Sequence, residues 1–288
     1  MKIFICLMLI CQTLNFFAQD IPAYRLYDNA GKPVTFSDVV ASASAADIVF
    51  FGELHNDPII HWLQFELTKQ LFEKKSENLI LGAEMFESDN QLILDEYLKG
   101  LIPAKKFGEE ARLWPNYNTD YKPLVDFAQK NKLQFVAANI PRRYASLVAN
   151  GGFEELNNLS AEAKGLIAPL PVAYDENLNC YKSMLGMGGM GKMSANSNFP
   201  KAQAIKDATM AHFIMKYWTK GKTFIQYNGS FHSDNHEGIV WYVKQKNKDI
   251  KIIVIASVSQ PDVTVLTDEN KGRGDYILCV PENMTKTH

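Results

Sequence analysis

Residues 48–62, IVFFGELHNDPIIHW, decide the fold of this 288-residue chain. An apolar run stops at Gly52, and Glu53 and His55 follow at once, just before a helical pattern that includes His61. A short, almost continuously apolar run is typical of a strand that is buried on both faces, as strands of parallel sheets are. The stretch therefore predicts a buried parallel strand whose carboxyl end carries a glutamate and a histidine.

The same pattern recurs along the chain. Short runs rich in Val, Ile and Phe alternate with helical patterns in most of the intervals, at residues 47–53, 78–87, 133–141, 222–232, 250–258 and 275–281. Strands alternating with amphipathic helices predict an α/β fold with a mostly parallel sheet and helices on both of its faces. Ahead of the first strand, residues 23–36 predict a small hairpin, and residues 36–44 a helix behind it.

The first residues read as a targeting segment. Residues 1–18 combine Lys2, an apolar stretch and a small residue at Ala18, which is typical of a cleaved secretory signal peptide. Ile10 before Cys11 is a poor lipoprotein signal, so we expect simple cleavage and an exported protein, periplasmic or associated with the outer membrane. Residues 19–288 then form a single domain. Its residues from about 149 to 200, rich in Gly and Met, predict an insertion or lid.

Composition excludes some classes of partner. The formal net charge is −2 and no basic stripe with interleaved aromatic residues appears, so nucleic acid is not expected as a partner. Two cysteines remain after cleavage, Cys180 and Cys279. Both paired and unpaired states are open, and the apolar run around Cys279 favours an ordinary buried thiol.

Polar side chains gather at the strand ends. Glu53 and His55 follow the first strand, Glu84 ends the second, and His232 follows the fourth. Ligands of such sheets bind beyond the carboxyl ends of the strands, so these side chains are expected to converge. Glu84 stands among apolar residues and needs a cationic partner or a metal.

Two further residues near these strand ends have open or supporting roles. His61 is open between a ligand and an ordinary helix residue. Asp207, on an otherwise apolar helix, is a candidate partner for a site imidazole.

The glycine-rich stretch GMGGMGK, residues 186–192, matches a phosphate-binding loop only by accident, because no apolar strand precedes it. Methionines recur there at every third position, and Tyr174 and Tyr181 precede them. Thioethers and phenols suit a flat apolar ligand such as a porphyrin, whose iron accepts Tyr or Met. The alternative is a flexible glycine loop without a ligand.

The chain resembles the ChaN family of haem-binding uptake proteins, which belongs to a wider group with erythromycin-esterase-like and Tiki-type proteins. The resemblance rests on five stretches in order: GELHNDPIIH, GAEMFE, AANIPRR, KDATMA and NGSFH. It implies haem as ligand, with Tyr174, Tyr181, Met187 and Met190 as the haem contacts. It also implies outer-membrane or periplasmic uptake components and a second copy of the chain as partners. The Gly- and Met-rich segment here lacks the His usual in ChaN proteins, which moves the expected contact to Tyr or Met.

The esterase-like and Tiki-type relatives imply a different function. Carried over to this chain, their Glu/His constellation would be Glu53, His55, Glu84 and His232, holding a divalent metal ion. A metal-dependent hydrolase of an ester or peptide would then use His55, Glu84 and His232 as catalytic residues. Haem binding is the favoured interpretation because ChaN is the nearest resemblance, and hydrolysis is the alternative.

Overall fold

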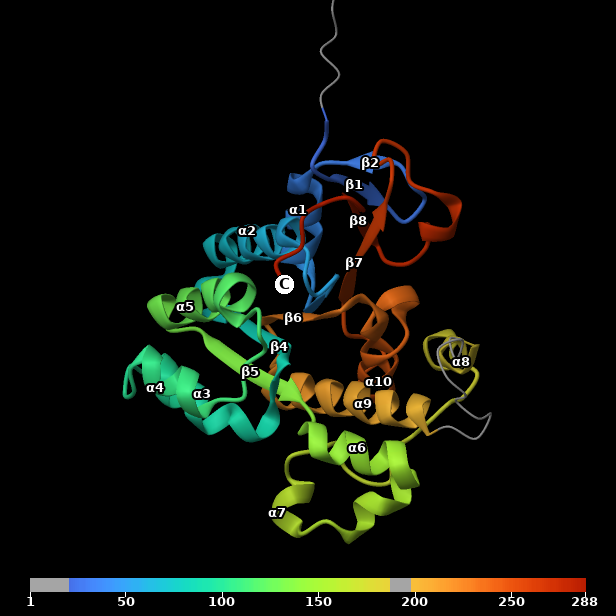
Figure 1. Ribbon diagram of the computed structural model, residues 1–288. Coiled ribbons are helices and arrows are strands. Elements are labelled where there is room, and N and C mark those ends of the chain that lie inside the picture. Colours follow the sequence, from blue (N-terminus) through green and yellow to red (C-terminus); the bar gives the residue numbers. More distant parts are fainter. Residues whose placement is uncertain (1–20, 187–197) are drawn as a thin grey trace, which may run out of the picture.

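The computed structural model describes residues 21–186 and 198–288 (Figure 1). The predicted signal peptide, residues 1–18, lies outside the described residues, as do Met187 and Met190. Within the described residues, no helix is both long enough and apolar enough to cross a membrane.

One eight-stranded sheet forms the centre of the molecule, in the order β2-β1-β8-β7-β3-β6-β4-β5. The six strands from β8 to β5 are parallel, and the hairpin of β1 and β2 adds an antiparallel edge. This confirms the predicted mostly parallel sheet and the predicted hairpin. The strands are β1 Arg25–Asp28, β2 Pro33–Val34, β3 Ile48–Glu53, β4 Leu79–Glu87, β5 Gln134–Asn139, β6 Thr223–Gly229, β7 Ile252–Gln260 and β8 Tyr276–Pro281.

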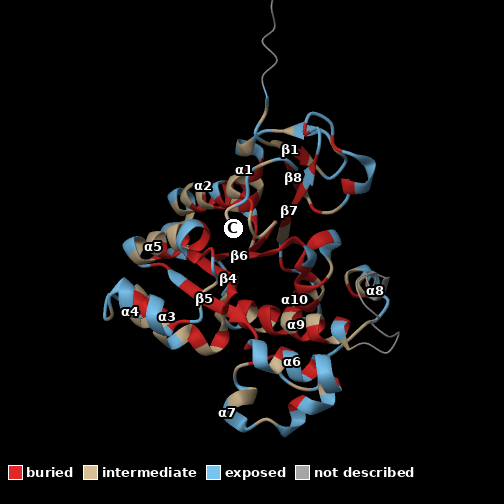
Figure 2. Ribbon diagram, in the orientation of Figure 1, coloured by how far each residue is buried: buried red, intermediate tan, exposed pale blue. Residues whose placement is uncertain are grey.

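Helices cover both faces of the sheet, as predicted, and the central strands β3 and β6 are buried along their whole length (Figure 2). Successive strand side chains point to opposite faces, so Val49 and Phe51 pack into one core while Ile48 and Phe50 pack into the other. The first core is covered by α1 Phe36–Ala45, α2 Pro58–Lys75, α3 Gln91–Leu98, α4 Ala104–Glu110 and α5 Lys122–Asn131. The second is covered by α6 Arg142–Gly151, α9 Phe199–Tyr217 and α10 Ile239–Lys246.

The strand order brings the polar strand ends together. β6 lies between β3 and β4, so the carboxyl ends of three neighbouring parallel strands meet at one edge of the sheet. The pairing of β4 with β5 shifts register between Ala83 and Glu87. Irregular pairing of this kind re-aims side chains, and here it falls on the stretch that contains Glu84.

The loop after β3 is short because α2 begins almost at once. The side chain of Asp57 accepts hydrogen bonds from the backbone N–H groups of Ile59 and Ile60, at 3.1 and 3.3 Å, and Pro58 occupies the first turn. An acidic N-cap followed by proline is a strong helix start. It fixes the position at which the chain passes His55 on its way from sheet to helix.

The segment predicted as an insertion is partly helical. α6 runs on to Gly151, α7 spans Ala161–Lys164 and α8 spans Asn179–Gly186. Both α6 and α8 contact α9, so the described part of this segment packs against the domain. A lid function for residues 149–200 stays a prediction. In the structure Cys180 and Cys279 are both free thiols.

Candidate functional site

A buried histidine held between two carboxylates forms the floor of the site. His232 lies in the turn after β6, and its Nε2 is 3.1 Å from Oε1 of Glu84. Its Nδ1 hydrogen-bonds to Oδ1 of Asp207 on α9, which confirms the predicted partnership of Asp207 with a site imidazole. The other oxygen of Glu84 accepts the backbone N–H of Gly229 at 2.8 Å.

The two carboxylates decide the charge of this histidine. Burial alone would lower the pKa of His232, but the negative charges of Glu84 and Asp207 and the hydrogen bonds to them raise it to about 10. Burial would likewise raise the pKa of Glu84, and the charge and hydrogen bond of His232 hold it below its ordinary value. At neutral pH the site floor is therefore an imidazolium paired with carboxylate.

Tyr181 extends this chain of contacts away from the sheet edge. Its side chain is fully buried, and its hydroxyl donates a hydrogen bond of 2.7 Å to Oδ2 of Asp207. Tyr174 is half-buried, with its ring 5.5 Å from the Tyr181 ring and 5.7 Å from that of Phe153. Neither tyrosine lines the pocket described below. The predicted haem contact of Tyr181 would require its hydroxyl to leave Asp207.

His55 faces the floor from the end of β3. Its Nδ1 is 2.9 Å from Oε1 of Glu53, so in the neutral ring Nδ1–H donates to the carboxylate and Nε2 keeps the lone pair. Burial lowers the pKa of His55, but the hydrogen bond to Glu53 and the charges of Glu84 and Glu53 outweigh it, leaving the pKa raised. The ring is 40% exposed. Only the neutral ring offers the Nε2 lone pair to a ligand, and the raised pKa makes that form less populated than in a free imidazole.

Glu53, which hydrogen-bonds to His55, is itself held by neighbouring side chains. Both of its carboxylate oxygens already receive donors, the hydroxyl of Tyr121 at 2.8 Å and the side-chain amide of Gln64 at 2.7 Å. His61 is also buried, and its Nε2 lies 3.1 Å from the backbone carbonyl of His55. The structure therefore places Glu53 and His61 beneath the loop that carries His55, as groups that hold it in place.

Gly229 lets His55 approach the floor. A Cβ atom at this position would lie 2.8 Å from Nε2 of His55 and 3.6 Å from Oε2 of Glu84. The first distance is too short for any real contact, so only glycine fits beneath the imidazole. Glycine at such positions allows close approach of a backbone to a functional group.

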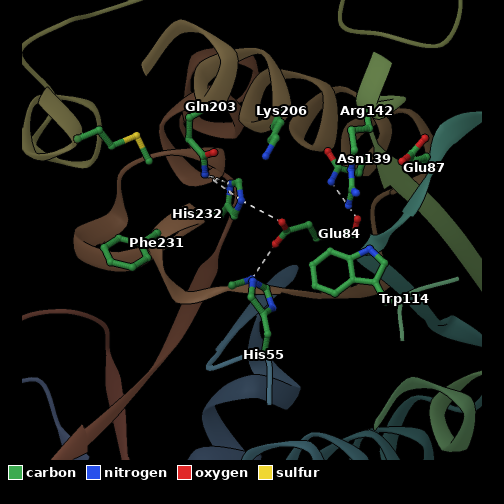
Figure 3. A pocket seen from close by; sticks show the side chains of 12 residues that line it. His55, Glu84, Glu87, Trp114, Asn139, Arg142, Gln203, Lys206, Phe231 and His232 are labelled. Atoms are coloured by element: carbon green, nitrogen blue, oxygen red, sulfur yellow. Dashed lines mark hydrogen bonds and ion pairs between the residues drawn. The ribbon is translucent and has the colours of Figure 1, made fainter. Parts of the chain in front are cut away.

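A pocket of about 350 Å³ opens above these residues (Figure 3). His55, Glu84 and His232 all line it, so the three predicted catalytic residues do face one cavity. Its walls also contain Met184, one of the regularly spaced methionines, and Lys206 and Phe231 from the stretches KDATMA and NGSFH. Trp114 and Gln203 line it too, and the sequence did not single them out. Of the last two, Gln203 carried a usable signal, because it lies one helical turn before Asp207 on the predicted helix.

The predicted metal ligands form two separate pairs, Glu53 with His55 and Glu84 with His232. Glu53 is occupied by its neighbours, and both ring nitrogens of His232 face carboxylates. Across the described part of the chain, no cluster of three or more His, Cys, Asp or Glu side chains is arranged to hold a metal ion. A divalent metal here stays a prediction.

Comparison with solved structures supports the fold. The ChaN structure of Campylobacter jejuni titled for cofacial heme binding superposes with a TM-score of 0.69, at 18% identity, over 88% of this chain and 96% of that one. A mutant of the erythromycin esterase EreC matches 90% of this chain and 98% of its own at 12% identity, with a TM-score of 0.49. The type III effector HopBA1 reaches 0.47 at 13% identity, covering 86% of this chain and 94% of its own. Only the first of these scores is high enough to carry an argument, and at its identity it shows the fold alone.

Comparison with family models gives the clearest result. A search of curated proteins finds no match. The model described as haem-binding uptake, Tiki superfamily, ChaN matches residues 39–243, which include every strand from β3 to β6 and all the residues of the site floor. This confirms the resemblance stated from the five sequence stretches. The chain belongs to the haem-binding uptake family of ChaN proteins in the Tiki superfamily.

Proposed function

We propose that this chain is an exported haem-binding protein of a haem or iron uptake system and that its porphyrin binds in the pocket above His55, Glu84 and His232. The family match over residues 39–243 carries the proposal. Export rests on residues 1–18, whose composition is that of a secretory signal peptide. Uptake components of the cell envelope are the partners that this function needs.

The chemistry of the pocket suits a porphyrin. Trp114 and Phe231 stand on opposite sides of its mouth, and Phe231 remains 56% exposed although it is a large apolar side chain (Figure 3). Exposed aromatic side chains at a cavity are typical anchors for flat apolar ligands. The sulfur-bearing side chain of Met184 adds a soft contact on the side of α8.

The pocket is small for a whole porphyrin. Ligand pockets span about 300 to 1,000 Å³, so this one lies near the lower end of the range and would leave part of a macrocycle uncovered. We propose that a second copy of the chain covers the uncovered part of the porphyrin. The proposed haem contacts would cover it as well, and they are Tyr174, Tyr181, Met187 and Met190. His55, which lines the pocket, is the residue that we propose faces the iron.

The proposed porphyrin position is tested by removing an aromatic anchor. We expect Phe231→Ser to weaken haemin binding by about tenfold, because the loss of a well-placed aromatic contact costs more than 1 kcal/mol. The dissociation constants are measured by absorbance titration in the Soret region. Leu92→Ser is the matched control, because Leu92 is 72% exposed and does not line this pocket. Equal effects of the two substitutions would place the porphyrin elsewhere.

Hydrolysis of an ester or peptide is a second candidate function, favoured by the hydrogen bond between Nδ1 of His55 and Glu53 and by the position of His55 in the pocket lining. A base held by a carboxylate in this way can activate water, with or without a metal ion. This function predicts turnover of chromogenic ester or peptide substrates, tested with and without added Zn²⁺ or Mn²⁺. In His55→Ala, kcat/KM should fall about 100-fold, and His236→Ala serves as control because His236 pairs with Asp275 outside the pocket. Failure to detect turnover in the unaltered protein would contradict it.

A further inference from the structure

The acidic side chains that line the pocket have ion-pair partners, whereas two basic side chains there have none within the described residues. Each of its carboxylates already has a cationic partner, Glu84 with His232 at 3.1 Å and Glu87 with Arg112 at 3.1 Å. Arg142 and Lys206 also line the pocket. Among the residues that the structure describes, neither guanidinium nor ammonium has a hydrogen bond or ion pair to another side chain.

These two cations lie on one wall. Arg142 is the first residue of α6, directly beyond the end of β5, and Lys206 precedes Asp207 on α9 (Figure 3). Figure 3 shows both side chains on the wall opposite His55, with Glu84 between the two walls. No side chain caps the first turn of α6, so the positive end of that helix adds to the same wall. Cations that face a cavity without partners favour an anionic ligand group there.

We propose that Arg142 and Lys206 bind the propionate carboxylates of haem. This rests on the proposed function and adds the orientation of the ligand. Haem is apolar across its faces and carries both carboxylates on one edge. That edge would meet the wall formed by α6 and α9 while the faces contact Trp114 and Phe231. Arg142 offers a planar fork that matches a carboxylate, and Lys206 adds a compact charge beside it.

The test compares haemin with haemin dimethyl ester, in which both carboxylates are neutral esters. Dissociation constants for both are measured on the full chain and on Arg142→Gln, Lys206→Gln and the double variant. We expect each single substitution to weaken haemin binding by about tenfold, since a charge-assisted hydrogen bond contributes about 1.5 to 3 kcal/mol. Binding of the dimethyl ester should stay within about twofold of the unaltered protein, because the ester offers no charge to lose.

Arg143→Gln is the matched control. Arg143 lies next to Arg142 on α6 but pairs with Asp89, and it does not line this pocket. It removes the same charge from the same helix and should leave the preference for haemin over its ester unchanged. Unaltered thermal unfolding of the variants ensures that affinity changes do not come from loss of the fold.

The possible outcomes distinguish the propionate assignment from haem binding itself. Saturable haemin binding with the preference over the ester intact in the double variant would overturn the propionate assignment and leave haem binding standing. A full chain that binds neither porphyrin saturably would overturn the propionate assignment together with the proposed function. Loss of the preference in Arg142→Gln and Lys206→Gln, but not in Arg143→Gln, is the result that we expect.

Discussion

Replacing His232 by alanine is expected to lower the free energy of unfolding by about 3 to 5 kcal/mol. The substitution leaves the carboxylates of Glu84 and Asp207 facing each other across a buried space without the cation between them. Breaking a buried ion pair by removing one partner is among the most destabilising changes a protein can suffer, because the remaining charge has neither water nor a counter-charge. Chemical denaturation at pH 7 measures the loss.

The pH dependence of stability gives this prediction a second readout. The pKa of His232 is about 10 in the folded chain, against about 6.5 in an unfolded one, so its pairing stabilises fully below pH 6.5. The contribution is lost as the pH rises from about 6.5 to about 10. The unaltered protein should therefore lose stability across this window. In His232→Ala that part of the pH dependence should disappear.

His212→Ala supplies the control for His232→Ala. His212 lies on α9, and its described contact is an edge-on packing against the ring of Phe213. Its removal should cost about 1 kcal/mol or less. Equal stabilities of the His212 and His232 variants, or a stability of the unaltered chain that does not change between pH 6.5 and 10, would contradict the buried imidazolium.

Gly238→Ala is expected to destabilise the protein by about 3 kcal/mol, through backbone strain of about 1 to 2 kcal/mol and overpacking of about 1 to 3 kcal/mol. Gly238 has a φ of +56° and a ψ of −122° just before α10. A Cβ atom there would lie 2.3 Å from the backbone carbonyl oxygen of His232 and 3.3 Å from Oδ2 of Asp207. Backbone cannot yield as a flexible side chain does, so His232 itself would have to move away from its carboxylates.

A second glycine separates the two causes. Gly272 has a φ of +79°, and a Cβ atom there would meet nothing within 4 Å. Gly272→Ala therefore carries the cost of positive φ alone, about 1 to 2 kcal/mol. Thermal unfolding of the two variants measures the difference. A Gly238→Ala protein as stable as Gly272→Ala would show that the close approach to His232 does not constrain the site.

Much of the sheet could be predicted from sequence because its signals are local. Apolar runs such as residues 48–53 and 250–258 report burial on both faces, and the helices between them report a parallel connection. The order of the strands in the sheet could not be predicted in this way. The placement of β6 between β3 and β4 depends on packing between residues far apart in the chain, and no local pattern records it.

The sequence predicted which residues form the site better than it predicted which of them contact each other. The convergence of His55, Glu84 and His232 follows from their places at strand ends, and the pocket contains all three. Which carboxylate holds which imidazole depends on distances of a few tenths of an ångström that only the folded chain sets. Sequence alone put Glu53 and Glu84 in one ligand set, whereas the structure divides them between His55 and His232.

The environment of Tyr181 is a clear example of what the sequence could not predict. In the sequence it stands beside a glycine- and methionine-rich stretch and suggests a phenol available to a ligand. In the structure α8 packs on α9, which buries the ring and directs its hydroxyl to Asp207. A tyrosine's exposure depends on the neighbour that its helix meets, which spacing within its own segment does not reveal. Trp114, which lines the pocket from a loop, lacked any local signal for the same reason.

The most direct test of the central claim is a crystal structure of the full chain saturated with haemin. We expect the porphyrin between Trp114 and Phe231, above Glu84, with its propionates toward Arg142 and Lys206 and its iron toward His55. Such a structure would place the haem at the carboxyl edge of β3, β6 and β4, where family membership and pocket chemistry coincide. A porphyrin bound at any other surface, with this pocket empty, would contradict the account.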